Sequence, residues 1–186
     1  MADVGVAHQR VSFADLERWP EDGRQYELYD GEVYVLPSPT FMHQLVSGEL
    51  YSVFRAHGQT HGGLVLYSPL DIVLTEYDVV QPDLVFFTAE RAGRLDRRKV
   101  IREAPDLAIE ILSPSTASND RGRKMQLLAR HGVREYWLVN PDPVRIEIYV
   151  LVKGQLMHRH TASGDMLVRS WLLPQLSLRP IDLVPP

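Results

Sequence analysis

The sequence predicts an α/β protein in which a mixed central β-sheet is flanked by helices, with an N-terminal β-hairpin. Apolar runs of strand length alternate with two longer segments of helical periodicity. The runs at residues 107–112 and 136–139 are apolar almost throughout, as is typical of central strands covered on both faces. Asp30-Gly31 stands between two strand-like segments and is a strong hairpin signal. Together these features favour a mixed α/β sheet with helices on its faces.

Composition restricts the class of protein. The chain has 186 residues, 45% apolar and 24% charged, and suits one domain with a substantial core. Its net charge of −4 argues against a surface broadly coated for nucleic acid, although a local basic patch is compatible with it. The absence of cysteine excludes disulfides and thiolate zinc sites. Because no apolar run approaches the roughly 20 residues of a membrane helix and no leader is evident, we expect a cytoplasmic protein without a membrane segment.

The N-terminal part predicts two helices around the hairpin. Residues 1–10 carry no pattern and are expected to be irregular. Residues 12–19 predict a short helix that Ser12 caps and a proline ends. Residues 26–36 predict the hairpin. Residues 41–57 predict a helix whose apolar side carries Leu45, Leu50, Val53 and Phe54.

The remainder predicts most of the sheet. A second long helix is expected from about residue 119 to 131. The charged run 90–103 is expected to be a solvated loop or a short helix. The tail from residue 154 has at most a short strand or two and then irregular chain. We expect strands at residues 64–67, 70–74, 83–88, 107–112, 135–139 and 145–152.

Two carboxylates interrupt these apolar strands. Glu110 stands in the middle of one, where a carboxylate removed from water needs a partner, a proton or a cation. Asp83 opens another, in the segment QPDLVFF. If the two strands are neighbours, both acids project to one edge of the sheet. There they would hold a hard cation such as Mg²⁺ or Mn²⁺, and the backbone carbonyl of Ile111 would add a ligand.

Lys124 adds a cation to this arrangement. On the predicted helix it shares a stripe with Leu127, Leu128 and His131, so it lies in register with leucines that should face the sheet. An ammonium directed inward would orient an attacking water and offset charge on a phosphoryl group, while a metal lowers the pKa of that water. The set therefore predicts phosphodiester hydrolysis by in-line attack.

Each of these residues also has a plain structural interpretation. Asp120 precedes Lys124 by one helical turn, which is the spacing of an ordinary helix ion pair. Asp83 follows a proline and would equally cap a loop. Glu110 is harder to explain without function, because a strand acid needs compensation. The three residues in this order, on strand, strand and helix, are more specific than any one alone.

With these residues in view, the chain resembles the Uma-two family of putative restriction endonucleases, within the PD-(D/E)XK nuclease superfamily. The resemblance spans about residues 26–152 and is carried by YELYDGEVYVLPSPTFMHQ, VVQPDLVFF, APDLAIEILSPST, DRGRK and HGVREYWLVNP. It implies a single restriction-endonuclease-like domain over residues 1–186, built on a helix, three strands, a helix and a strand. It also implies metal-dependent cleavage of nucleic acid.

The resemblance assigns roles to individual residues. Asp83 matches the Asp of the superfamily motif, and Glu110 matches its second acid. The usual lysine stands two residues after that acid, where this chain has Leu112, so the resemblance depends on Lys124 replacing it in space. His43 lies near the start of the first long helix, where several superfamily nucleases have a metal-binding His or Glu. A lone histidine there is otherwise a helix-cap or surface residue.

Further polar residues are candidates for supporting roles. Gln81, Asp120 and Glu32 are candidates for the layer of groups that orients the ligands. Glu32 and Glu49 are also alternative acids. Glu49 follows His43 by six residues, a spacing that does not share a helix face, so the two are not expected at one site.

We therefore predict a DNA nuclease that uses Mg²⁺ or Mn²⁺, with Asp83, Glu110 and Lys124 as catalytic residues. The alternative is a non-catalytic dimeric or nucleic-acid-binding module that retains the fold. A homodimer is expected because cutting both strands of a duplex usually needs two active sites. Tyr136 and Trp137 would stack on a base or belong to the core. A basic cluster would contact phosphate or form a solvated loop: Arg91, Arg94, Arg97, Arg98, Lys99 and Arg102.

Overall fold

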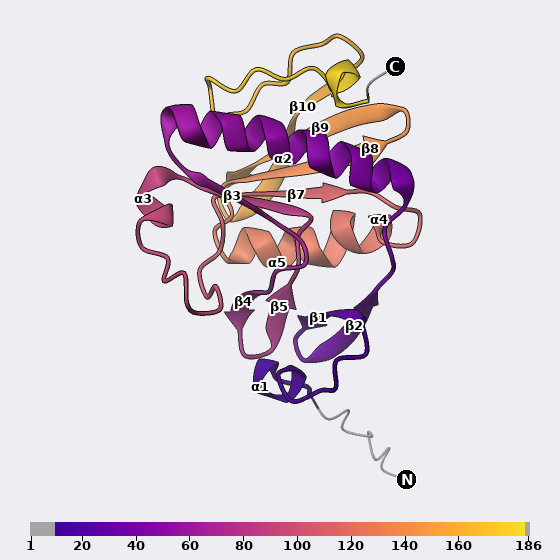
Figure 1. Cartoon of the computed structure of the whole chain (residues 1–186), viewed down its shortest axis with the longest axis vertical. Helices are drawn as coiled ribbons and strands as arrows, with labels where there is room; N and C mark the ends of the chain where they lie inside the picture. Colours follow the sequence, from indigo (N-terminus) through magenta and orange to yellow (C-terminus); the bar gives the residue numbers. More distant parts are fainter. Residues whose placement is uncertain (1–9, 185–186) are drawn as a thin grey trace.

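Two β-sheets organise the chain, whose computed structural model describes residues 10–184 (Figure 1). The expectation of irregular chain at the N-terminus falls almost wholly outside the described residues. The larger sheet has six strands in the order β10-β9-β8-β7-β6-β3. These strands are β3 (Leu64–Tyr67), β6 (Leu84–Phe87), β7 (Leu107–Ile111), β8 (Glu135–Pro141), β9 (Val144–Val152) and β10 (Gln155–Ser163).

The smaller sheet contains the predicted hairpin. Its four strands follow the order β2-β1-β5-β4. The hairpin turns at Asp30 and Gly31, which both have positive φ, 52° and 79°, as a tight two-residue turn requires. The sequence predicted a single sheet beside the hairpin. Instead, a three-residue strand that no pattern predicted pairs with the hairpin and with the strand expected at residues 70–74, so these segments form a sheet of their own. The four strands are β1 (Gln25–Tyr29), β2 (Glu32–Leu36), β4 (Ile72–Thr75) and β5 (Asp78–Val80).

The helices lie largely where periodicity predicted them. Helix α1 (Phe13–Leu16) begins with a capping box between Ser12 and Asp15. Helix α2 (Phe41–His61) runs one turn further than predicted, to a glycine with positive φ. Helix α3 (Ala89–Ala92) is the short helix allowed in the charged run.

The predicted helix at residues 119–131 is not uniform. It consists of α4 (Ala117–Asn119), a π-helical turn η1 (Asp120–Lys124) and α5 (Met125–Arg130). π-Helical turns are rare and occur mostly as short insertions in α-helices, frequently at functional sites. Here the turn begins at Asp120 and ends at Lys124, and both side chains are buried.

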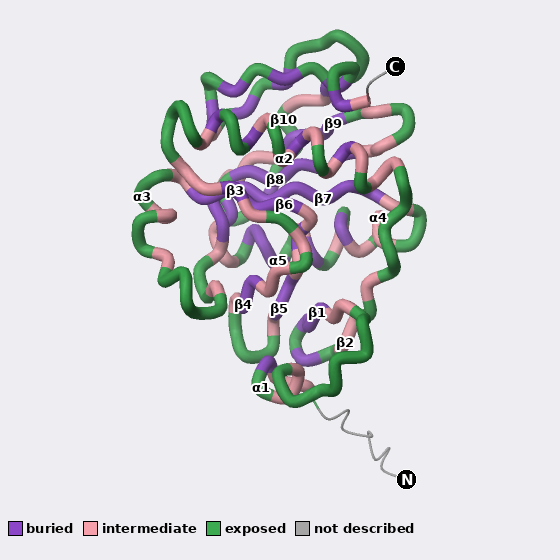
Figure 2. Tube along the Cα trace, in the orientation of Figure 1, coloured by how far each residue is buried: buried purple, intermediate pink, exposed green. Residues whose placement is uncertain are grey.

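Helices cover both faces of the six-stranded sheet (Figures 1 and 2). On one face, α2 packs through Val46, Leu50 and Phe54. On the other face, α5 packs through Leu127 and Leu128. Strand β7 is buried along its whole length, as predicted for a central strand. Its odd-numbered residues join the α2 side of the core and Ala108 joins the α5 side, so the side chain of Glu110 faces α5.

Strand register fixes the position of Asp83. Strand β6 runs antiparallel to β7 with Leu84 opposite Ile109, which places Asp83 at the level of Glu110. The neighbourhood of the two acids that the sequence analysis assumed is therefore confirmed.

The C-terminal region is more ordered than predicted. Strand β10 has nine residues and pairs with β9 along its length. The segment after β10 crosses the α2 side of the molecule (Figure 1) and buries Leu173, Leu176 and Leu178 in the core, before the short 3-10 helix η2 (Pro180–Leu183). In the described part of the chain, none of the helices has both the length and the apolar character needed to cross a membrane.

Candidate active site

A pocket of about 140 Å³ opens where the two sheets and the first turns of α2 meet. Asp83, Glu110 and Lys124 all line it, so the fold brings the three predicted catalytic residues together. His43 and Ile111 line the same pocket. Four separate elements or their ends supply these side chains: α2, the start of β6, β7 and the π-helical turn.

Lys124 points inward, as predicted. Its side chain is 2% exposed, and its Nζ lies 2.8 Å from Glu110 Oε1 and 2.8 Å from Glu27 Oε1. The contact with Asp120 is longer, at 3.9 Å. Lys124 is therefore not a surface residue paired with Asp120, because it is buried and its closest partners are Glu110 and Glu27.

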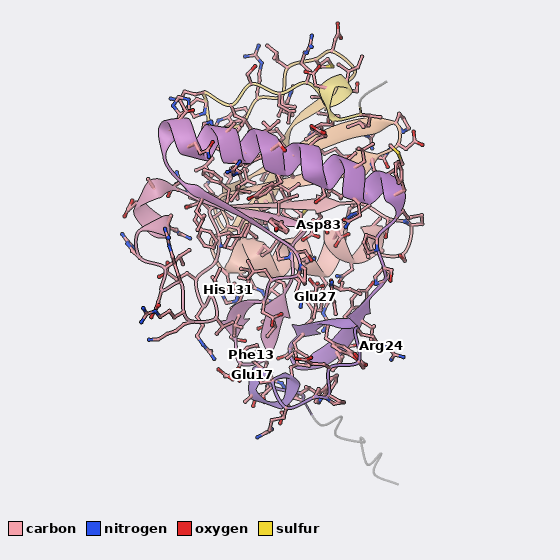
Figure 3. The ribbon with its side chains drawn as sticks, viewed as in Figure 1. Phe13, Glu17, Arg24, Glu27, Asp83 and His131 are labelled. Atoms are coloured by element: carbon pink, nitrogen blue, oxygen red, sulfur yellow. The ribbon has the colours of Figure 1, made fainter. Side chains whose placement is uncertain are left out.

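Glu27 is the residue of this site that the sequence analysis missed. It lies on β1 in the smaller sheet and is fully buried. Its Oε2 accepts a hydrogen bond from the hydroxyl of Tyr29 at 2.6 Å, and its Oε1 accepts one from the backbone N–H of Gln81 at 2.8 Å. Figure 3 shows Glu27 and Asp83 approaching from the two different sheets. The signal was available, because Glu27 interrupts an apolar strand in the same way as Glu110.

Asp83 connects three elements of the fold. Its Oδ2 accepts a hydrogen bond from the backbone N–H of Ile111 at 2.7 Å. The same oxygen lies 3.2 Å from Nε2 of His43 on α2. Asp83 therefore links the start of β6 to β7 and to α2, and its side chain does not cap a local loop. A contribution from the Ile111 carbonyl stays a prediction.

The supporting residues divide into two groups. Gln81 lies at the site, where its amide nitrogen donates to Asp71 at 2.7 Å while its backbone holds Glu27. Asp120 is buried beside Lys124. Glu32, in contrast, is 73% exposed and pairs with Arg123 at the surface, so the fold does not bring it to the pocket. Glu49 is half-buried on α2 and does not line the pocket either.

Two aromatic residues belong to the core. Tyr136 and Trp137 are fully buried, so the suggestion that they stack on a base is wrong. The hydroxyl of Tyr136 donates to the backbone carbonyl of Asp120 at 3.1 Å, and this contact supports the π-helical turn.

The site carries an excess of buried acids. Burial raises the pKa of Glu110 well above its usual range, and the charge of Lys124 opposes that rise. Burial likewise raises the pKa of Asp120 to about 6, again against Lys124. For Lys124 itself, burial lowers the pKa, but Glu110 and Glu27 outweigh it and hold the pKa well above its usual value. The carboxylates therefore need protons or a further cation besides Lys124.

The pKa of His43 depends on the neighbouring charge of Asp83. Burial lowers the pKa of His43, but the hydrogen bond and the charge of Asp83 outweigh it, so the pKa lies above its ordinary value.

Asp83 and Glu110 offer the pocket carboxylate oxygens, the ligand type that Mg²⁺ prefers. Buried His43 Nδ1 has no hydrogen-bond partner among the described residues, and buried Glu110 Oε1 has none besides its ion pair with Lys124. Within residues 10–184 no group of three or more His, Asp or Glu side chains is arranged to hold a metal ion. Mg²⁺ usually takes only one or two carboxylates and keeps several waters, so a site with two carboxylates matches the number of protein ligands that it needs.

The chain is similar to other proteins over most of its length. It is 30% identical over 178 residues to the uncharacterized protein slr1290 of Synechocystis sp., covering 94% of this chain and 87% of that protein. A crystal structure described as a putative nuclease belonging to DUF820, from Anabaena variabilis, matches with a TM-score of 0.76 at 22% identity. The match covers 93% of this chain and 97% of that one and confirms the predicted fold class.

The family comparison covers both sheets and the pocket. Residues 13–181 match the model of the Uma2 family, described as putative restriction endonucleases. The chain therefore belongs to the Uma2 family, as its sequence motifs had indicated.

Proposed function

We propose that this protein is a nuclease that hydrolyses DNA phosphodiester bonds with the help of Mg²⁺ or Mn²⁺. Asp83 and Glu110 would bind the ion, and Lys124 would orient the attacking water. The observation that supports this proposal most is the buried ammonium of Lys124, 2.8 Å from Glu110 in the pocket that also contains Asp83.

Lys124 is suited to orienting a water. A lysine ammonium has three N–H donors. The two carboxylates at 2.8 Å take at most two of them, and Asp120 at 3.9 Å is beyond hydrogen-bonding distance. Because Lys124 lines the pocket, its remaining donor is available to a water or to a phosphate oxygen. The contact with Glu27 keeps the ammonium charged and in place.

The other residues would position the substrate and the ligands. His43 holds one carboxylate oxygen of Asp83 from the α2 side, and His43 Nδ1 is a candidate further ligand. The hydroxyls of Ser113 and Thr116, 3.0 Å apart, line the pocket and would contact a phosphate oxygen. When bound, the divalent ion would supply a Lewis acid that lowers the pKa of water and offsets phosphoryl charge.

Cleavage of plasmid and of single-stranded DNA, with Mg²⁺, Mn²⁺ or EDTA, tests the proposal. Asp83→Asn, Glu110→Gln and Glu27→Gln should each reduce the rate by about 10²–10³-fold, as the loss of one electrostatic contributor does elsewhere. Glu32→Gln is the matched control, because Glu32 lies outside the pocket. Folding of each variant is checked by circular dichroism.

Unchanged cleavage in all three of these variants would refute the proposed site. Calorimetric titration with Mn²⁺ measures metal binding separately from catalysis. The Glu110→Gln variant should show a reduced heat of Mn²⁺ binding whether or not a substrate is cleaved. Metal binding without any cleavage would favour the alternative of a non-catalytic module that retains the fold. Assembly depends on the substrate: duplex cleavage would need a homodimer with two pockets, which sedimentation analysis measures, whereas a single strand needs one pocket.

A further inference from the structure

We propose that the pocket takes DNA with unpaired bases, and that Phe41 and Tyr67, two exposed rings beside its mouth, hold those bases by stacking. This inference rests on the proposed nuclease function and specifies the substrate class and two positioning residues. It follows from where the rings lie, from the charge of the mouth and from the place of the basic residues.

Phe41 is exposed at the edge of the mouth. It is the first residue of α2 and is 80% exposed, which is unfavourable for a phenyl ring in water. It stands between Pro39 and Gln44, and both of these residues line the pocket. Gln44 follows Phe41 by one helical turn, so the two side chains share a face of α2. Phe41 is not one of the residues that line the pocket, so we place its ring just outside the rim, on the side of Gln44.

Tyr67 borders the pocket from the sheet. It is the last residue of β3, the edge strand, and is 57% exposed. The next residue, Ser68, lines the pocket and donates its N–H to the carbonyl of Asp83 at 3.0 Å. The ring of Tyr67 packs edge-on against Tyr51 of α2, with centroids 4.9 Å apart and planes at 74°. This contact holds the ring in place while more than half of the residue stays open to solvent.

The pocket lacks an exposed basic side chain. Among the described residues the only lysine or arginine that lines it is the buried Lys124, and much of the remaining lining consists of prolines, serines and other uncharged residues beside Asp83 and Glu110. Proteins that grip duplex DNA neutralise phosphates with exposed lysine and arginine, and this supplies most of their affinity. A pocket without exposed lysine or arginine but with aromatic rings nearby instead suits stacking, which is available only to bases whose faces are not covered by neighbouring pairs.

The basic cluster of residues 91–102 does not supply the positive charge that the pocket lacks. It begins in α3, which lies beside the C-terminal end of α2 (Figure 1), whereas Phe41 begins that helix. A helix of 21 residues is roughly 30 Å long. Most of the cluster is also paired with acids: Arg91 with Asp106, Arg94 with Glu90, Lys99 with Asp96 and Arg102 with Glu76.

Binding in EDTA tests the inference without cleavage. The probe is a labelled 20-nucleotide single strand and the duplex of the same sequence, followed by fluorescence anisotropy at 50 and 200 mM salt. The single strand should bind at least tenfold more tightly than the duplex. Its affinity should fall less than tenfold over this salt range, which corresponds to about two neutralised phosphates.

Substitutions of the two rings test whether they hold the single strand. Phe41→Ala and Tyr67→Leu should each weaken single-strand binding about tenfold, or about 1.4 kcal/mol. Phe41→Tyr should bind the single strand as tightly as the wild type, because it keeps a ring that can stack. Trp171→Ala is the matched control: Trp171 is 60% exposed but belongs to the C-terminal segment, which contributes no residue to this pocket, so its loss should change nothing. Thermal unfolding of Tyr67→Leu checks that losing the contact with Tyr51 has not unfolded the chain.

Three results would overturn the inference: duplex bound as tightly as the single strand, ring variants that bind like the wild type, or a dimer that either ring variant dissociates. The last result would assign this face to a second copy of the chain. Failure of the nuclease proposal looks different. In that case the single strand still binds through both rings in EDTA, but no cut appears with either metal.

Discussion

Replacing Lys124 with methionine removes the ammonium from the buried acids while keeping much of its aliphatic volume. In the wild type, Nζ lies 2.8 Å from both Glu27 and Glu110. At an effective dielectric constant of about 20, each contact represents about 6 kcal/mol of attraction, most of which dehydration of the ammonium cancels. Breaking a buried ion pair by removing one partner costs about 3–5 kcal/mol. We therefore expect the free energy of unfolding to fall by about 4 kcal/mol at pH 8.

The loss should be smaller in acid. Burial already raises the pKa of Glu110, and removing the opposing charge of Lys124 raises it further. A carboxyl group whose folded pKa exceeds its unfolded value binds its proton more tightly in the folded state. Its stabilising contribution is present below the unfolded pKa and is lost as pH rises toward the folded pKa. The variant should accordingly be closer to the wild type at pH 5 than at pH 8.

Urea unfolding, followed by tryptophan fluorescence in EDTA at both pH values, measures this. Lys99→Met is the control, because Lys99 is 78% exposed and its pairing with Asp96 should be worth little. A loss below about 1 kcal/mol at pH 8, or the same loss at pH 5, would show that Lys124 does not balance the buried acids.

Three further predictions concern stability. Glu135→Ala should lower the unfolding free energy by about 3 kcal/mol in urea, because the carboxylate accepts from the Trp137 indole and two backbone amides of the C-terminal segment; no change would contradict this. Gly48→Ala should raise Tm by about 2–4 °C, since a methyl there meets nothing within 4 Å, whereas Gly63→Ala, at φ 118°, should lower it. Because the pKa of Asp120 is raised from 3.8 to about 6, stability should fall as pH rises between these values, and Asp120→Asn should flatten that slope in urea titrations.

The sequence was informative wherever one element's own pattern was enough. The hairpin was predicted from Asp30-Gly31, since that turn needs residues that tolerate positive φ. The inward direction of Lys124 was predicted from its stripe with two leucines, because helix faces follow from spacing alone. The pattern also predicted that Glu110 would be a buried acid, and it is 4% exposed.

The sequence was less informative about partners between elements. Glu32 and Glu27 are both acids of the same hairpin, and the sequence analysis chose Glu32. Only the packing of the smaller sheet against the π-helical turn decides that Glu27 reaches Lys124 while Glu32 pairs with Arg123 at the surface. The face that each strand residue presents is a local property, but which element that face meets is not.

By itself, then, the sequence determined most of the strands, the approximate positions of the helices, the family motifs and the three residues of the proposed catalytic set, because each depends on local periodicity or on residue type. Tertiary structure decided that the hairpin forms a second sheet, that Glu27 is the second carboxylate on Lys124, and that Asp83, Glu110 and Lys124 line one pocket. Those contacts join segments distant in the chain, and their geometry is set by how sheets and helices pack against one another.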